Sequence, residues 1–337
     1  MRFRLDVRFV KIAGCVLAAL ALLLGGVLGI RAWEEAHAGV PQSVLDAANA
    51  GQDRAQVQYN GGVYTPKKRL ETTLVMGVDK YADEQKQDVQ GEYEQADFLL
   101  LLIMDREAEA CTALHLNRDT MTEIQMLTDA GAVARTFVGQ LTLAHTYGGT
   151  AKLNCENTVA AVSNLLENVK IDHYLSLTMD GVVKLNDLVG GVTVEVLDDF
   201  SGIDDTLEQG KTVTLKGQQA LTYVRARSGL EDSSNLRRME RQHQYLEALQ
   251  RQLTAGAESR EDFTLSALME VNDYMVSDYS VEQLSDFSER LEDYGVSEYR
   301  TLEGEAVIGD EFMEFYPDGE KLKEMVMELF YERVGDA

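Results

Sequence analysis

The sequence predicts an α/β protein, an α-β-α sandwich around a mixed central β-sheet, preceded by one N-terminal transmembrane helix. Apolar runs of strand length alternate with amphipathic helical segments between residues 72 and 253, as expected for helices packed on a sheet. Residues 12–30 carry no charge and come close to the ~20 apolar residues that cross a bilayer as a helix. The composition, 45% hydrophobic and 26% charged, is that of a globular protein with a core.

A chain of 337 residues is expected to hold one or two domains of ~100–200 residues with appendages. Basic residues precede the apolar segment, which predicts a single-pass protein of the cell membrane with a cytoplasmic N-terminus and an extracellular main domain. A cleaved signal peptide is the alternative for this segment. The predicted order is a cytoplasmic tail at 1–11, the anchor at 12–30, an extracellular stalk at 31–71, the main domain at 72–254 and an acidic C-terminal extension at 255–337.

The net charge of −26 argues against nucleic acid as a partner, because phosphate backbones would be repelled. The three cysteines, Cys15, Cys111 and Cys155, lack the spacing of a disulfide framework or a metal site, and a Cys111–Cys155 bridge stays open. No glycine-rich nucleotide loop is present, so a nucleotide cofactor is not indicated. His145 has no partner at a catalytic spacing, which favours a structural role.

The first predicted strands place charged residues at their ends. Residues 72–78 form an apolar run that ends at Asp79, and the seven apolar residues 98–104 predict a central strand that follows Asp97. Residues 109–116 are predicted to lie beside it and lead into Arg118. Carboxylates and a guanidinium group are therefore expected at one sheet edge, although turn or cap residue is the ordinary role of such aspartates.

Further elements follow from cap residues and periodicity. Asn154 and Asp180 are expected to begin two helices, and Ser280 with Gln283 forms a capping box for a third. Asp318 is expected to cap a final amphipathic helix. Strands are predicted at 171–177, 192–196, 212–215, 299–302 and 312–315, the last two pairing with each other.

The segment from Tyr223 to Leu253 concentrates arginine. On an extended backbone Arg225 and Arg227 point to the same side. Guanidinium groups hold phosphate oxygens in pairs, so these arginines and a polar row on the next helix could form an anion site. The alternative is solvated arginines paired with nearby acids, as is expected for Arg237 and Arg251. The polar row consists of Arg238, Arg241, Gln242 and Tyr245, related by steps of three, four and seven.

Taken together, these residues resemble the LytR-CpsA-Psr family, over about Thr72–Leu253. The resemblance rests on the order of several motifs rather than on any single one. They are Leu-Val-Met-Gly-Val-Asp79, Ala-Asp97, Asn-Arg118-Asp-Thr, Ala144-His-Thr-Tyr-Gly-Gly149, Asp172-His-Tyr174, Asp187-Leu-Val-Gly-Gly-Val-Thr-Val194, Leu-Thr-Tyr-Val-Arg225-Ala-Arg227 and Arg238-Met-Glu-Arg241-Gln242.

The resemblance implies a phosphotransferase that moves a cell-wall glycopolymer, such as teichoic acid or capsule, from a polyprenyl-diphosphate carrier to peptidoglycan. Asp79 and Asp97 would hold Mg²⁺, or Mn²⁺ in its place. Gln140 stands where the family usually has a lysine, which removes one positive charge from the expected site. The catalytic residues would be Asp97, Arg118, Arg225 and Arg227, and the substrate-binding residues Arg118, Arg225, Arg227, Arg238, Arg241 and Gln242.

Two other functions remain alternatives. The domain could hold polyprenyl phosphates without catalysis, as a carrier or as an envelope sensor or regulator. It could also be a structural extracellular protein whose arginines form salt bridges with neighbouring acids. The transferase is separated from these alternatives by one feature, the convergence on one concave site of Asp79, Asp97, Arg118, Arg225 and Arg227. Arg225 and Arg227 directed into solvent away from Asp97 would argue against both ligand-binding functions.

Overall fold

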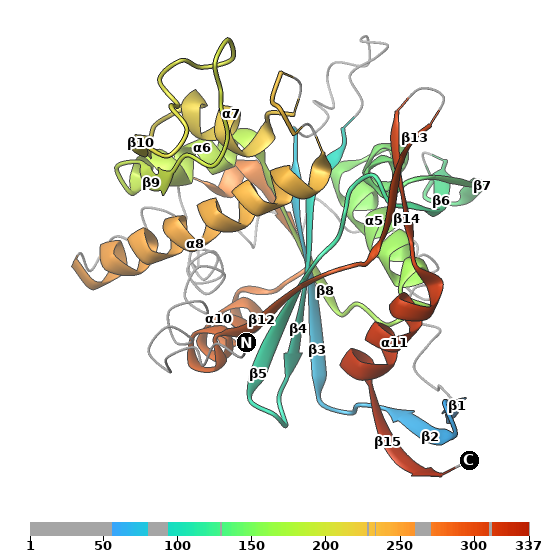
Figure 1. Cartoon of the computed structure of the whole chain (residues 1–337). Helices are drawn as coiled ribbons and strands as arrows, with labels where there is room; N and C mark the ends of the chain where they lie inside the picture. The colour runs from blue at the N-terminus through green and yellow to red at the C-terminus, as the bar shows by residue number, and fades with distance from the viewer. Residues whose placement is uncertain are drawn as a thin grey trace. The chain divides into compact units, whose positions relative to one another are not determined.

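The computed structural model describes residues 56–79, 94–128, 130–227, 229–232, 234–259, 271–309 and 312–336 (Figure 1). They form two compact units. One comprises Leu177–Met275 and Tyr279–Ser297, and the other comprises the described residues up to Ser176, Val276–Asp278 and those from Glu298 onward. The predicted mixed α/β fold with a central mixed sheet is confirmed.

The apolar segment 12–30 lies outside the described residues, so the predicted anchor stays a prediction. Within the described ranges, no helix combines the length and the apolar character that crossing a membrane requires.

A six-stranded sheet has the order β11-β8-β3-β4-β5-β12. The antiparallel pairs β3–β4 and β4–β5 confirm the first three predicted strands. Val78 pairs with Ala96 across β3 and β4, so Asp79 and Asp97 come at the same end of the sheet. The strands are β3 (Leu70–Val78), β4 (Ala96–Asp105), β5 (Ala110–His115), β8 (His173–Thr178), β11 (Met275–Ser277) and β12 (Val296–Thr301).

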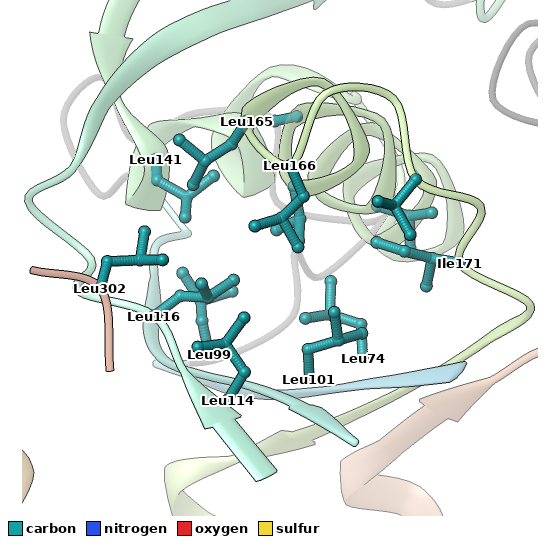
Figure 2. Packing of buried hydrophobic residues seen from close by; sticks show 14 of the residues in the cluster. Leu74, Leu99, Leu101, Leu114, Leu116, Leu141, Leu165, Leu166, Ile171 and Leu302 are labelled. Atoms are coloured by element: carbon teal, nitrogen blue, oxygen red, sulfur yellow. The ribbon is translucent and has the colours of Figure 1, made fainter. Parts of the chain in front are cut away.

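The core of the sheet-bearing unit forms where strand leucines meet α5 (Ala151–Leu165). Figure 2 shows Leu74, Leu99 and Leu114 on the strands facing Leu165 and Leu166 at the end of this helix. Helix α11 (Gly319–Phe330) adds apolar side chains to the same cluster. After it, β15 (Tyr331–Asp336) pairs with β2 (Gly62–Pro66), which also pairs with β1 (Val57–Tyr59). The C-terminal part of the chain therefore contributes to the same core.

Two hairpins differ from the sequence prediction. The hairpin of β6 (Met121–Leu127) and β7 (Val133–Gln140) was not predicted. The expected pairing of 299–302 with 312–315 is wrong: β12 joins β5 in the central sheet, and β14 (Met313–Pro317) pairs with β13 (Gly304–Ile308). Short strands without a tight turn between them carry too little local signal to select a partner.

The caps of two helices were also wrong. The first turn of α5 is capped by Thr150, and that of α6 (Met179–Leu188) by Thr178, whose side chains accept from backbone amides. Asn154 and Asp180 instead lie inside the helices. The capping box of α10 (Val281–Tyr294) and the Asp318 cap of α11 are confirmed.

The second unit packs helices around a small hairpin. Its core includes Phe200, Tyr223 and Tyr245, all buried. Phe200 and Tyr223 stack with their ring centroids 5.6 Å apart. The elements are α6, β9 (Val192–Glu195), β10 (Thr212–Leu215), α7 (Gln218–Arg225), α8 (Asn235–Ser259), η2 (Asn272–Tyr274) and α10.

Cys111 and Cys155 are both buried free thiols, so no bridge links them.

Candidate functional site

The predicted site residues fall into two sets, one in each unit. In the sheet-bearing unit, Arg118 forms ion pairs with Asp97 and with Asp119, the latter at 3.5 Å from Nε to Oδ1. Its Nη2 also donates to the side chain of Gln95. The backbone amide of Asp79 donates to the carbonyl of Gln95 at 3.4 Å, so the end of β3 and Arg118 both contact Gln95.

Arg118 is nearly buried, with 14% of its side chain exposed, so its interactions are screened by solvent less than those of a surface pair. A tight turn after β5 positions it. The amide of Asp119 donates to the Asn117 side chain at 2.9 Å, and the Thr120 hydroxyl donates to the Asn117 carbonyl at 2.6 Å. The turn therefore directs the Arg118 guanidinium and the Asp119 carboxylate to the end of the sheet where Asp97 lies.

Gln140, at the end of β7, is buried beside this turn. Its amide nitrogen donates to Asp119 Oδ1 at 3.3 Å and to the Met313 carbonyl at 2.7 Å. A neutral amide thus occupies the position where the resemblance leads one to expect lysine. Residue 140 therefore gives Asp119 a neutral hydrogen-bond donor and no positive charge.

Asp79 and Asp97 suit a hard divalent cation. Within the described part of the chain, no group of three or more histidine, cysteine or acidic side chains is arranged to hold a metal ion. Mg²⁺ is usually bound by one or two carboxylates and keeps several waters or takes substrate phosphate oxygens. Two carboxylates at the ends of neighbouring strands fit that donor set.

The arginine pair of the other unit is not on a strand, contrary to expectation. Arg225 is the last residue of α7, and Arg227 follows Ala226, whose backbone is extended with φ −55° and ψ 133°. The helix extends this far because Ala220, Tyr223 and Val224 bury one face of it. Arg225 is exposed and Arg227 is half-buried.

The polar row on α8 is buried, with Arg238, Arg241 and Gln242 exposed by 3%, 1% and 6%. Arg241 was expected to bind substrate directly, but its guanidinium group is engaged inside the protein. Nε donates to the Tyr223 carbonyl at 2.9 Å, Nη2 donates to the Ala226 carbonyl, and Nη1 pairs with Asp198. Gln242 donates to the Val224 carbonyl at 3.2 Å.

Two further residues complete this network. Arg237 was expected at the surface, but it is half-buried and pairs with Asp198 at 2.6 Å, while Arg251 is exposed as predicted. Asp198 was missed because it follows β9, far from α8 in the sequence, and a single aspartate in a loop gives no signal of its partner.

A cavity of about 430 Å³ lies where β3 begins, and none of the predicted site residues lines it. Its lining includes Lys67, Lys68 and Lys170 together with apolar side chains from α11 and β15. The predicted carboxylates come where β3 ends. The cavity is therefore separate from the carboxylate set.

Comparison with known proteins places the chain in one family. The model of the LytR_cpsA_psr family matches residues 42–330, which include every predicted site residue. A protein from Halalkalibacterium halodurans, named polyisoprenyl-teichoic acid–peptidoglycan teichoic acid transferase TagU, is 31% identical over 227 residues, covering 63% of this chain and 67% of that protein. A protein from Streptococcus mutans named biofilm regulatory protein A is 28% identical over 65% of this chain and 53% of its own length.

The fold is also found in solved structures. A protein from Streptococcus agalactiae matches with a TM-score of 0.62 at 19% identity, covering 81% of this chain and 95% of that one. The match with this chain spans 50% to 67% of the length of the first six curated relatives. The match of the family model across most of the chain decides the assignment: the chain belongs to the LytR_cpsA_psr family.

Proposed function

We propose that this protein is a phosphotransferase that moves a glycopolymer from a polyprenyl-diphosphate carrier to peptidoglycan. The observation that carries the proposal is the family match, which spans both the aspartates at the ends of β3 and β4 and the arginines of α7 and α8. The name of the relative from Halalkalibacterium halodurans supports the substrate class. Asp79 and Asp97 would hold Mg²⁺, or Mn²⁺ in its place, while Arg118, Arg225, Arg227, Arg238 and Gln242 would bind the diphosphate.

The chemistry suits these residue types. A sugar hydroxyl of the acceptor would attack the phosphorus that carries the glycan, and the bond to the second phosphate would break. The new product bond is a phosphodiester, and polyprenyl phosphate leaves. Such a step depends on positioning and on neutralising charge over the phosphate oxygens, which guanidinium groups provide. The hydroxyl proton would pass to Asp97 or Asp79, and a bound divalent ion would stabilise the negative charge.

Arg227 is one of the arginines that would bind the diphosphate. Arg227→Ala should lower the rate of phosphodiester formation by about 10²–10³, because the transition state loses one charged donor. The assay combines full-length protein in detergent with Mg²⁺, a glycan on a lipid diphosphate and peptidoglycan fragments. Arg251→Ala is the matched control, since Arg251 is exposed on α8, and its rate should stay unchanged.

A second candidate function is a carrier or regulator without catalysis, which the name of the relative from Streptococcus mutans favours. Wild-type protein that binds the lipid diphosphate but forms no phosphodiester would reject the transferase and support the carrier.

We also propose that residues 12–30 anchor the chain in the membrane with the main domain outside the cell. The support is the uncharged apolar segment after four basic residues. A reporter enzyme that is active only outside the membrane, fused after residue 60, should be active. An inactive fusion would contradict the orientation.

A further inference from the structure

Each nitrogen of the buried Arg241 guanidinium group has an acceptor within its own unit. Its three nitrogens donate to the carbonyls of Tyr223 and Ala226 and to the carboxylate of Asp198. Its Cζ also lies 5.7 Å from the centre of the Phe200 ring, within the range of a cation–π contact. Arg241 itself is 1% exposed. This arrangement leaves the side chain held from several directions.

The two carbonyls belong to the peptide groups 223–224 and 226–227, of which the first lies one residue before Arg225 and the second directly before Arg227. The last carbonyls of a helix have no partner within the helix, and they carry its partial negative charge. At the end of α7, Arg241 and Gln242 supply donors to the carbonyls of residues 223, 224 and 226. Without these donors, the carbonyls would present negative charge beside the two arginines that are proposed to bind an anion.

We propose that Arg241 is a positioning residue: it fixes the peptide group between residues 223 and 224, one residue before Arg225, and the peptide group that joins Ala226 to Arg227, and so holds these two arginines ready for a diphosphate. This inference rests on the proposed function. Because a peptide unit is planar, fixing the carbonyls of 223 and 226 restricts the backbone from which both arginine side chains extend. Preorganised donors bind an anion without the cost of ordering them at binding.

Asp198 forms ion pairs with two arginines of α8. One of its carboxylate oxygens pairs with Arg241, and the other lies 2.6 Å from Nε of Arg237. Asp198 therefore keeps one cationic partner when Arg241 is replaced, which limits the penalty of leaving a buried charge unpaired. A variant that lacks only the Arg241 guanidinium is thus expected to remain folded.

The test is a double-mutant cycle with inorganic pyrophosphate and Mg²⁺ as the probe, measured by calorimetry on full-length protein in detergent. Arg241→Met should weaken binding about tenfold, and Arg225→Ala with Arg227→Ala should weaken it more. Adding Arg241→Met to that double variant should have no further effect, because Arg241 acts only through the two arginines. Arg251→Met is the matched control on the same helix.

The outcomes distinguish a failure of the proposed anion site from a failure of the positioning role of Arg241. If Arg225→Ala with Arg227→Ala binds pyrophosphate as the wild type does, the proposed anion site is wrong. If that variant binds weakly but Arg241→Met binds normally, the positioning role is wrong. A full additional loss of binding in the combined variant would instead make Arg241 a direct ligand.

Hydrogen exchange at residues 222–227 should accelerate in Arg241→Met while thermal unfolding remains cooperative. If the variant does not fold, Arg241→Lys replaces it in the cycle, because one ammonium group cannot reproduce the forked contacts.

Discussion

Burial sets the charge state of His145. The residue has no exposed surface, and its Nε2 lies 3.8 Å from the Cys155 sulfur. Desolvation lowers the pKa of His145 to about 4. The imidazole is therefore neutral at neutral pH, which agrees with the structural role that the sequence indicated and excludes a general base tuned to pH 7.

The lowered pKa predicts acid sensitivity. In the unfolded chain His145 titrates near ~6.5, so between pH ~6.5 and 4 the unfolded state binds the proton and the folded state does not. Stability should therefore fall as pH falls through this window, by about 3 kcal/mol from this residue. Urea unfolding at several pH values should show a shallower decline for His145→Gln than for wild type. An unchanged pH dependence would reject the assignment, and His243→Gln, which alters a partly exposed histidine, is the control.

At the scale of an element, Asn154 joins η1 (Leu141–Tyr147) to α5. Its Oδ1 accepts from the amides of Gly148 and Gly149 at 2.8 and 3.0 Å, and its Nδ2 donates to Glu94 at 2.8 Å. Gly148 is required here because an added Cβ would lie 2.3 Å from the backbone of the helix. The motif Ala144-His-Thr-Tyr-Gly-Gly149 therefore forms a tight connection between two helices.

Asn154→Ala should destabilise the fold by about 2–4 kcal/mol, because the buried amide of Gly148 loses its acceptor and the buried Glu94 carboxylate loses a donor. Chemical denaturation measures this change. Asn164→Ala on the exposed face of the same helix should cost less than about 0.5 kcal/mol. Equal effects of the two substitutions would contradict the role of Asn154.

The buried strands were easier to predict from the sequence than the exposed ones. Strands β3 and β4 are enclosed on both faces, so their long apolar runs were clear. The β7 strand is mostly exposed, with Val133 and Val138 at 53% and 66%, and gave no alternating pattern. Arg225 was assigned to a strand because spacing alone cannot show that α7 continues to it. The Arg241–Asp198 pair joins residues 43 apart, a contact that local patterns do not contain.

At the scale of the whole molecule, the acidic C-terminal region belongs to the fold. Met325, Leu329 and Phe330 lie in the same core cluster as Leu74 of β3. Phe330→Ala should lower the free energy of unfolding by about 3–5 kcal/mol, because a buried aromatic side chain leaves a cavity. Phe312→Ala, at a residue 43% exposed, should change it little. Urea titration of both variants checks this, and a silent Phe330→Ala would mean that α11 is dispensable.

The two buried thiols have a practical consequence. Cys111 and Cys155 have no exposed surface, and burial raises the pKa of Cys111 to about 12 and that of Cys155 as well. Almost no thiolate exists at neutral pH, so neither should react with maleimide dyes in the folded state. With Cys15→Ser, cysteines introduced at the exposed Lys68 and Arg251 would be the labelled sites, one in each unit. Each unit could then carry a dye at one chosen position, without labelling of the two buried thiols.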